Sequence, residues 1–294
     1  IYNNLYVHLG IGGDYPSGNK RKDFLTKIFI MMLKNFVKLK SHRNYKAYYV
    51  FPNFGCLGNC SYCAIKFAVG SVKSMAVNEV MQEIYKGISL GFKYFKIFSS
   101  DLGNYGVDIN TNCFNLLDSL TDIKGDYQLE LNYINPQWIV GHIDQFLRIL
   151  EKRKVREIYM PIQSGSQRIL DMMNRRYKID DLKRCLRLIN SKHPYLKIIT
   201  SVIVGFPTER EDDFAETVNL LKSFNFSETN VFSYSERPCT LSASFQEKVP
   251  SGIIYRRRTI LKKKLRAHML KVRINDILFD LTFDFGQGWK IIKI

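Results

Sequence analysis

The sequence predicts an α/β protein in which helices alternate with the strands of a parallel sheet. Over residues 46–245 of the 294-residue chain, short β-rich runs alternate with longer amphipathic segments. Six strands that alternate with helices in this way favour a parallel βα barrel or a doubly wound sheet. The run "LKIITSVIVGFP" has few polar interruptions, as expected of a strand in a sheet that helices cover on both faces.

The elements of this alternation have recognisable ends. The first strand leads into a loop rich in cysteine, and the helix after it ends on Gly91, the residue best able to adopt the left-handed C-cap conformation. Pro136 stops the third strand, and a turn follows the fourth. The last helix of the series carries acidic residues in its first turn, where they complement the helix dipole. The strands are expected at 46–54, 93–101, 127–136, 155–166, 196–207 and 228–238, and the helices at 77–91, 111–123, 137–152, 166–175, 180–193 and 209–226.

In both architectures, ligands bind at the carboxyl ends of the strands. This rule singles out the loops at 54–66, 99–106, 161–166, 204–210 and 234–241.

The regions outside the alternation are interpreted as extensions. We expect an N-terminal extension over residues 1–45, a core over 46–245, and a basic C-terminal helix with a tail over 246–294. For the basic amphipathic stretch at 24–40 we expect core packing with a solvated lysine face. Because the chain starts at Ile1 rather than Met, we also expect residues upstream of it.

The composition is that of a globular protein with a large positive charge. Hydrophobic residues make up 46% of the chain and charged residues 24%. No apolar run approaches the roughly 18 residues that span a bilayer, so we expect no membrane segment. The net charge of +17 favours polyanions through counterion release, which makes RNA the first partner to consider. A solubility or habitat effect is the alternative.

The remaining cysteines indicate the cellular compartment. Cys113, Cys185 and Cys239 are scattered along the chain, unlike a disulfide framework, and there is no secretory signal pattern. We therefore expect a protein of the reducing cytoplasm.

Three of the six cysteines, Cys56, Cys60 and Cys63, occupy the short stretch "FGCLGNCSYCAIK". Thiolates are soft ligands that suit zinc or an iron–sulfur cluster. A structural zinc site needs a fourth ligand, and residues 47–90 contain no other cysteine and no histidine. Three cysteines hold three irons of a cubane 4Fe–4S cluster and leave the fourth iron open. The alternative is three cysteines that are buried by chance.

The C-x3-C-x2-C spacing, with Tyr62 before the third cysteine and a βα array after it, resembles the radical S-adenosylmethionine superfamily. The resemblance implies that the open iron binds the amino and carboxylate groups of S-adenosylmethionine. Electron transfer, for which a donor such as flavodoxin or ferredoxin is expected, then cleaves the sulfonium and yields a 5′-deoxyadenosyl radical. The protein positions and insulates these cofactors, which supply the difficult chemistry.

Further stretches resemble one branch of that superfamily, the methylthiotransferases. They are "GCLGNCSYCAIKFAVG", "SSDLGNYG", "INP", "PIQSGSQRILDMMNRRY", "SVIVGFPTEREDDFAETVNLL" and "FSYSERPCT", in the family's order and spacing over residues 46–245. The strongest resemblance is to the archaeal and eukaryotic type that methylthiolates N6-threonylcarbamoyladenosine in tRNA. It implies a partial, TIM-like (β/α)6 barrel of the radical S-adenosylmethionine type, with the cluster at its mouth.

The sequence also departs from that family. Its members carry an N-terminal domain with three further cysteines for a second cluster, whereas the 55 residues before Cys56 contain no cysteine. A C-terminal nucleic-acid-binding β-barrel is also usual in the family, and too few residues follow the basic helix to form one. Val69 stands where the family has arginine, Ser100 for glutamine, Ser201 for aspartate and Cys239 for glycine. These departures leave the cluster intact and put sulfur insertion in question.

The strand ends supply the cofactor-binding candidates. Ser99, Ser100 and Asp101 follow the second strand, where the superfamily contacts the methionyl amine; a capping role for Asp101 is the alternative. A buried glutamine needs hydrogen-bond partners, so Gln163 and its neighbour are candidates for the cofactor's ribose or carboxylate. Glycine permits close backbone approach to the adenine after the fifth strand, and a simple turn is nearly as good an explanation. The full set of candidates is Tyr62, Ser99, Ser100, Asp101, Gln163, Ser164, Ser201, Gly205, Phe206 and Pro207.

Three residues after the sixth strand are candidates for catalysis. Cys239 is interpreted as a thiol relay or an extra ligand, or alternatively as a small, half-buried side chain. Tyr234 and Arg237 are placed to stack on or neutralise a substrate, and surface packing is the alternative.

The segment "YRRRTILKKKLRAHMLKVR" (255–273) carries nine Lys or Arg residues and no acid. Its apolar residues recur at helical spacing and predict an amphipathic helix with one basic face. A phosphate-binding role and a merely solvated face explain this charge equally well.

These observations lead to a first hypothesis of a methylthiotransferase-like radical enzyme acting on tRNA. The second hypothesis is a stand-alone radical enzyme with one cluster that modifies a peptide or small molecule without sulfur insertion. A third, a non-catalytic RNA-binding protein with a vestigial cluster, conflicts with the intact cysteine loop.

Overall fold

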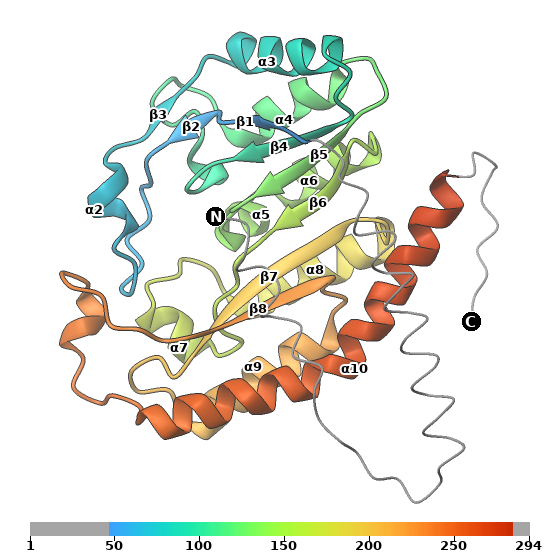
Figure 1. Cartoon of the computed structure of the whole chain (residues 1–294). Coiled ribbons are helices and arrows are strands. Elements are labelled where there is room, and N and C mark those ends of the chain that lie inside the picture. Colours follow the sequence, from blue (N-terminus) through green and yellow to red (C-terminus); the bar gives the residue numbers. More distant parts are fainter. Residues whose placement is uncertain (1–46, 285–294) are drawn as a thin grey trace, which may run out of the picture. The chain divides into compact units, whose positions relative to one another are not determined.

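A parallel six-stranded sheet forms the centre of the protein in the computed structural model (Figure 1). The structure describes residues 47–284, with the backbone alone for 267–271 and 273–284. Every neighbouring pair of strands in the sheet is parallel, as the sequence predicted. The strands are β1 (Ala47–Val50), β4 (Tyr94–Phe98), β5 (Gln128–Asn132), β6 (Val155–Tyr159), β7 (Lys197–Val204) and β8 (Glu228–Ser233), in that order across the sheet.

The sheet is open, because within the described residues β1 and β8 lie at its two edges and do not pair with each other. Between consecutive strands the chain crosses over through helices. These are α3 (Val77–Ser89), α4 (Cys113–Asp122), α5 (Pro136–Gly141), α6 (Ile143–Glu151), α7 (Gln167–Met172), α8 (Ile179–Lys192) and α9 (Glu211–Ser223). The arrangement is a partial βα barrel in which all six strands end at the same edge.

The two faces of the sheet differ in character because successive side chains of a strand point to opposite sides. Outward residues such as Ile97 and Leu131 are fully buried in the apolar core beneath the helices. The inner face carries charged groups: Glu130 is 1% exposed and forms ion pairs with Lys96 and Arg156, at 3.4 and 3.9 Å. The inner face is therefore polar enough to face a ligand.

The expected elements are confirmed with local differences. Pro52 separates the first predicted strand into β1 and the short strand β2 (Asn53–Phe54). The helix predicted at 137–152 is interrupted at His142, which divides it into α5 and α6. Four short elements were not predicted, because two to five residues carry too little periodicity to recognise. They are the strand β3 (Lys73–Ser74), the helix α2 (Ile65–Val69) and the single-turn helices η1 (Leu102–Asn104) and η2 (Leu241–Ser244).

The predicted basic helix is part of α10 (Ser251–Asp284), the long helix at the bottom of Figure 1 that packs against α9, β7 and β8. Leu261 and Leu265 anchor it in the core, each at most 1% exposed. Arg257 is also buried, and donates to Glu209 Oε2 at 2.7 Å and to Glu211 Oε1 at 3.0 Å. Part of the basic sequence thus holds the helix in place.

Two sequence-based expectations concern other parts of the chain. The extension over 1–45, including the amphipathic stretch at 24–40, lies outside the described residues. In the part that the structure describes, no helix is both long and apolar enough to cross a bilayer.

A substitution at Gly165 tests the packing of the segment after β6 against α9. A Cβ at this position would lie 2.6 Å from the backbone of Glu216 and Thr217, so Gly165→Ala forces two elements apart. We expect Gly165→Ala to lower the free energy of unfolding by about 1–3 kcal/mol. The control is Gly141→Ala, where a Cβ meets nothing within 4 Å and a helical alanine is favourable. Chemical denaturation measures both, and equal stability of the two variants would contradict this packing.

Candidate active site

A hairpin at the edge of the sheet holds the three cysteines. Strands β2 and β3 pair antiparallel, and the segment between them contains the cysteines and α2. At its start, Gly55 adopts a φ of +85°, and a Cβ there would lie 2.2 Å from the carbonyl oxygen of Ser71. Only glycine allows the two ends of the segment to cross this closely.

The cysteine segment is attached to two other parts of the barrel through Ser61. The Ser61 amide donates to the Met173 carbonyl at 3.1 Å, and its hydroxyl donates to the Met172 carbonyl at 2.8 Å. The Ser61 carbonyl accepts from the amide of Ser242 at 2.8 Å, in the short helix η2 (Leu241–Ser244) after β8. These bonds fix the cysteines relative to the ends of β6 and β8.

Two of the three thiols, those of Cys56 and Cys60, lie beside a space that a side chain at residue 58 would fill. A Cβ added to Gly58 would lie 3.0 Å from Cys56 Sγ and 3.9 Å from Cys60 Sγ. Three donors point at the sulfurs: Gly58 N and Asn104 Nδ2 lie 3.2 and 3.7 Å from Cys56 Sγ, and Arg175 Nη1 lies 3.6 Å from Cys60 Sγ. Donors of this kind stabilise thiolates, the form in which cysteine binds metal.

Burial of the thiols has the opposite effect to these donors, because it disfavours the charged thiolate. It raises the pKa of the Cys56 and Cys63 thiols above the ordinary value, while the cations Arg175 and Lys66 favour the thiolate of Cys63. Among the described residues, no group of three or more His, Cys, Asp or Glu side chains converges on a single ion. A cubane binds each cysteine through a different iron, so its ligands need not converge in that way.

Buried polar atoms without a partner gather at this edge of the sheet. Five such side-chain atoms occur in the described part of the chain, and four of them belong to Asn53, Ser99, Gln163 and Arg175. These residues lie beside the cysteine hairpin or follow the carboxyl ends of β4 and β6. Because buried polar groups are rarely left unpaired, this concentration indicates a ligand, and it fits a polar cofactor beside the cysteines.

The segment after β4 contributes Ser99 to this edge but uses Asp101 internally. Both residues are buried. The Asp101 carboxylate accepts from the amides of Gly103 and Asn135 and from Trp138 Nε1, all at 3.1 Å. Burial raises the pKa of Asp101, while these donors favour its ionised form. This geometry favours the capping role that the sequence left open, and Asp101 reaches the cysteines only through Asn104, which donates to it and to Cys56.

The predicted residues after β6 and on β7 point in different directions. Gln163 has a φ of +79°, and its Oε1 has no partner. Ser164 instead lies against α9, with its hydroxyl 3.3 Å from that of Thr217. Ser201 lies on the inner face near the hydroxyl of Tyr159, whose pKa burial raises and Ser201 lowers.

An apolar cluster joins three of the predicted residues. Phe206 is fully buried against Ile169 and Met173, with Tyr62 and Tyr234 packed around it. The ring centroids of Phe206 and Tyr234 are 5.6 Å apart in an edge-to-face arrangement. Burial raises the pKa of Tyr62. The structure thus brings Tyr62, Phe206 and Tyr234 together behind the cysteine hairpin.

The remaining predicted residues lie beside this cluster. Gly205 has a φ of +76°, and a Cβ there would lie 2.3 Å from Ile254 of α10. Pro207 is buried, and Ser100 is half-buried at the end of β4. Arg237 and Cys239 are exposed on the loop after β8. Cys239 has a φ of +64°. This conformation favours glycine, the residue that the methylthiotransferases have at this position.

The comparisons with known proteins match this geometry. The model of the Radical SAM superfamily matches residues 50–221, which include the three cysteines and four complete strands of the sheet, β4 to β7. The chain belongs to the radical SAM superfamily. This membership confirms the resemblance seen in the sequence and indicates an enzyme.

Relatives and structural neighbours of this radical SAM chain carry related descriptions. A probable threonylcarbamoyladenosine tRNA methylthiotransferase of Pyrococcus abyssi is 32% identical over 71% of this chain and 49% of its own length. A ribosomal protein uS12 methylthiotransferase of Dictyoglomus thermophilum is 32% identical over 82% of this chain and 57% of its own length. The chain therefore spans about half the length of such relatives.

A solved structure of the radical S-adenosylmethionine methyltransferase TsrM from Kitasatospora setae superposes with a TM-score of 0.57. It is 16% identical and covers 70% of this chain and 40% of its own length. At this identity the likeness shows the fold alone, and it supports the predicted TIM-like architecture of the radical SAM type.

Two polar residues near the cysteines, Asn104 and Arg175, were not among the residues predicted from the sequence. Asn104 lies in "SSDLGNYG" and Arg175 in "MNRRY", both stretches that carry the resemblance. Nothing in the local pattern distinguishes Arg175, which is 6% exposed, from its neighbour Arg176. Only the tertiary contact with Cys60 identifies it.

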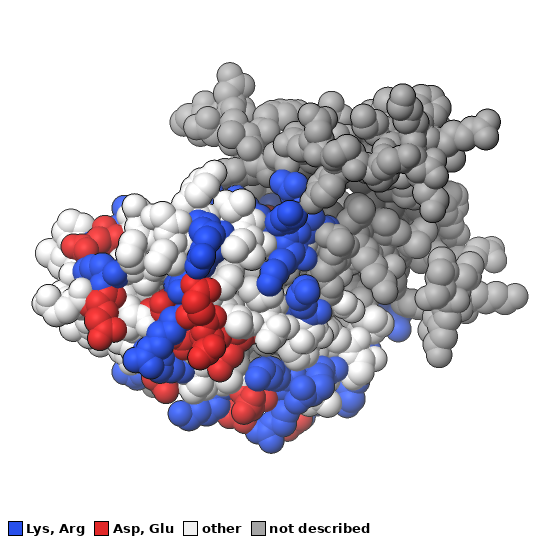
Figure 2. Space-filling view, turned by 90° about the horizontal axis from the view of Figure 1, so that it is seen from below, with Lys and Arg blue, Asp and Glu red and all other residues white. Residues whose placement is uncertain are grey.

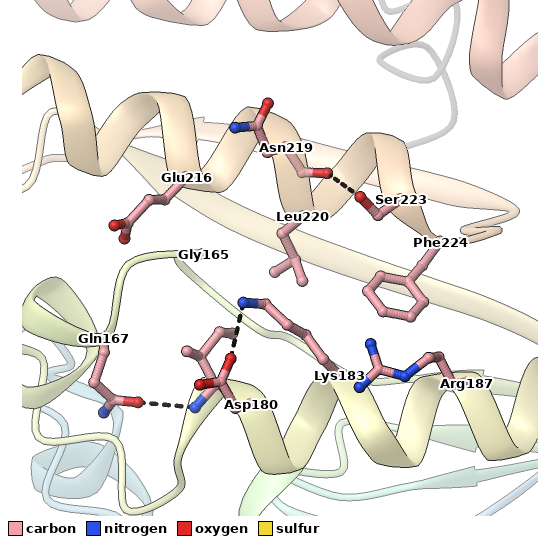
Figure 3. A pocket seen from close by; sticks show the side chains of 11 residues that line it. Gly165, Gln167, Asp180, Lys183, Arg187, Glu216, Asn219, Leu220, Ser223 and Phe224 are labelled. Atoms are coloured by element: carbon pink, nitrogen blue, oxygen red, sulfur yellow. Dashed lines mark hydrogen bonds and ion pairs between the residues drawn. The ribbon is translucent and has the colours of Figure 1, made fainter.

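A cleft of about 520 Å³ between α8 and α9 lies apart from these residues (Figure 3). Its polar groups bond to one another: Gln167 accepts from the Ile179 amide at 2.8 Å, and Lys183 pairs with Asp180 at 3.0 Å. None of the predicted site residues lines it. The cysteine edge, rather than this cleft, is the candidate active site.

A substitution at Asp101 tests the internal role of this carboxylate. In Asp101→Asn, one side-chain oxygen is replaced by an amide that faces donors, so we expect a loss of about 1–3 kcal/mol in the free energy of unfolding. Asp126→Asn, which breaks an exposed ion pair with Lys93, is the control and should change stability little. Thermal unfolding compares the two. A stable Asp101→Asn protein would return Asp101 to the cofactor-binding candidates.

Proposed function

We propose that this chain is a radical SAM enzyme of the methylthiotransferase type that acts on tRNA. The observation that carries the proposal is the concentration of unpartnered buried polar atoms around the cysteine hairpin, at the edge where parallel sheets bind ligands. The matching family model and the methylthiotransferase relatives support the same function.

In this proposal Cys56, Cys60 and Cys63 would hold a 4Fe–4S cluster. When bound, the cluster would supply the one-electron chemistry that cleaves S-adenosylmethionine. Gln163 and Ser99 offer unpartnered oxygens to the cofactor. Arg175 is a buried cation that forms no ion pair with a carboxylate within the described residues, and the negative charge of cluster or cofactor would compensate it.

The substrate and the cellular partners belong to the same proposal. The relative from Pyrococcus abyssi is described as a tRNA methylthiotransferase, and a charge of +17 suits tRNA. A small one-electron donor such as flavodoxin or ferredoxin would supply the electron in the cytoplasm. The alternative, a single-cluster enzyme without sulfur insertion, has less support because the relatives are methylthiotransferases.

Replacing the three cysteines with alanine tests the cluster. Anaerobically reconstituted wild type should hold about four irons per chain, absorb in the brown region and convert S-adenosylmethionine to 5′-deoxyadenosine once reduced. The triple variant should lose all three properties, whereas Cys185→Ala, at a buried cysteine of α8, should retain them. If the triple variant still held about four irons per chain, the assignment of these cysteines as cluster ligands would be wrong. Release of S-adenosylhomocysteine alone would indicate simple methyl transfer instead.

The basic helix has a second, RNA-binding role in this proposal, and the structure narrows the residues that serve it. Arg256 and Arg257 both pair with Glu211, at 3.0 Å. On the face shown in Figure 2, basic and acidic side chains lie interspersed. Lys262, Lys263 and Lys264 are exposed to solvent, whereas Arg257 is buried, and on this ground of exposure we take the three lysines as the candidates for phosphate contact.

Changing Lys262, Lys263 and Lys264 to glutamine should weaken tRNA binding at low salt. Removal of one lysine–phosphate interaction should reduce the slope of log affinity against log salt by roughly 0.9. The charge-matched control changes the exposed Lys86, Lys93 and Lys124 to glutamine. These lysines lie in or next to α3, β4 and α4, toward the β1 edge of the sheet, whereas α10 packs at the β8 edge. The control should keep the wild-type slope. Filter binding at several salt concentrations measures the slopes. Identical slopes for all three proteins would remove α10 from RNA binding.

A further inference from the structure

A row of aromatic side chains crosses the inner face of the sheet beside the cysteine hairpin. We propose that this row is the surface on which an unpaired nucleobase of the RNA substrate stacks. The inference rests on the proposed function and identifies the residues that recognise the base. We call these side chains the aromatic row: Tyr49, Phe51, Phe54, Phe98, Tyr133 and Tyr159.

The rings of the aromatic row contact one another in sequence. Phe51 stacks on Tyr49 and Phe54, with centroids 6.4 and 6.1 Å apart and planes within 20° and 6°. The row continues edge to face through Phe98, whose centroid lies 5.8 Å from Phe51 and 5.5 Å from Tyr133. Tyr133 then lies 4.7 Å from Tyr159. The row therefore runs from the cysteine hairpin across β1, β4 and β5 to β6.

One end of the row is exposed. Phe54 is 62% exposed, Tyr49 53% and Phe51 41%, whereas the aromatic side chain of Phe95 on the outer face is fully buried. Adjacent parallel rings that remain in water are a costly arrangement for packing alone and are typical of a binding surface. Since Phe54 precedes Cys56 by two residues, a base stacked here lies at the same mouth as the cysteines.

Tyr133 adopts a backbone conformation that indicates function. Its φ is +60°, which is uncommon for any residue except glycine and is strained for a bulky one. The strain is held by neighbouring bonds: the Tyr133 carbonyl accepts from the Leu102 amide at 2.9 Å. The result of this conformation is that the ring of Tyr133 joins Phe98 to Tyr159.

Hydrogen-bonding groups follow the row and favour a base over an extended peptide. Burial raises the pKa of Tyr159, while Ser201 and Asn230, which lie near its hydroxyl on the next two strands, lower it. Lys96, which pairs with Glu130, lies over the ring of Tyr49, 5.8 Å from its centroid. Stacking rings beside amide and hydroxyl groups are the means by which proteins bind unpaired bases. An extended peptide would instead pair with a free strand edge, and the row lies on a face.

The test compares an RNA hairpin that has an unpaired adenosine in its loop with the same hairpin carrying an abasic site there. Stacking is worth roughly 1–3 kcal/mol per base, so the abasic hairpin should bind wild type about 5- to 150-fold more weakly. Phe51→Leu and Tyr133→Asn should bring this ratio close to one, since both remove a ring and asparagine tolerates the conformation of residue 133. Tyr133→Phe, which keeps the ring, should retain the wild-type ratio.

The control is Tyr85→Leu, which removes an equally exposed ring from α3 outside the row and should keep the ratio. Row variants that retain the full abasic penalty would overturn the inference. A wild type that binds both hairpins equally would also overturn it, as expected if the row receives a peptide. Iron content and 5′-deoxyadenosine formation by wild type are measured in parallel. If these are present while the base ratio fails, only the inference is wrong; if they are absent, the proposed function fails independently.

Discussion

The common direction of the strands is the constraint on which the rest of this structure depends. Because all six strands are parallel, their carboxyl ends meet at one edge, and segments more than a hundred residues apart in sequence become neighbours there. Ser61, for example, bonds to Met173, which follows β6, and to Ser242, which follows β8. The cysteine hairpin is thereby placed beside Gln163, Phe206 and the aromatic row without any local signal that would require it.

The energetic cost of this edge is visible in its unpartnered groups. Arg175 is a buried cation whose Nη1 lies 3.6 Å from Cys60 Sγ, and Ser99 and Gln163 bury oxygens without donors. Leaving a buried polar group unpaired costs about 1–3 kcal/mol, and more for a charge. A bound cluster and cofactor would offset that cost. The apolar interior of the outer layer, with Ile97 and Leu131 fully buried, supplies the stability that permits it.

Helix α10 connects the basic end of the described chain to the cofactor edge. Arg257 donates to Glu209, and Glu209 in turn accepts from the amide of Gly205 at 2.7 Å, in the loop proposed for the adenine. Ile254 occupies the space that a side chain on Gly205 would need. Helix α10 is therefore packed directly against the loop that follows β7.

The sequence by itself determined the fold class, the order of the strands and the cysteine motif, because periodicity and spacing are local properties. It also placed Tyr62, Phe206 and Tyr234 at strand or loop ends that meet in the structure. It left open which polar groups face the cofactor: Asp101 turned out to cap its own loop, and Ser164 lies against α9. Arg175 and Asn104 were not recognised at all. The exposed row around Phe51 and the burial of Arg257 likewise became visible only with the tertiary structure. The physical reason is that direction, burial and pairing of a side chain depend on residues far away in sequence, which only the folded chain brings into contact.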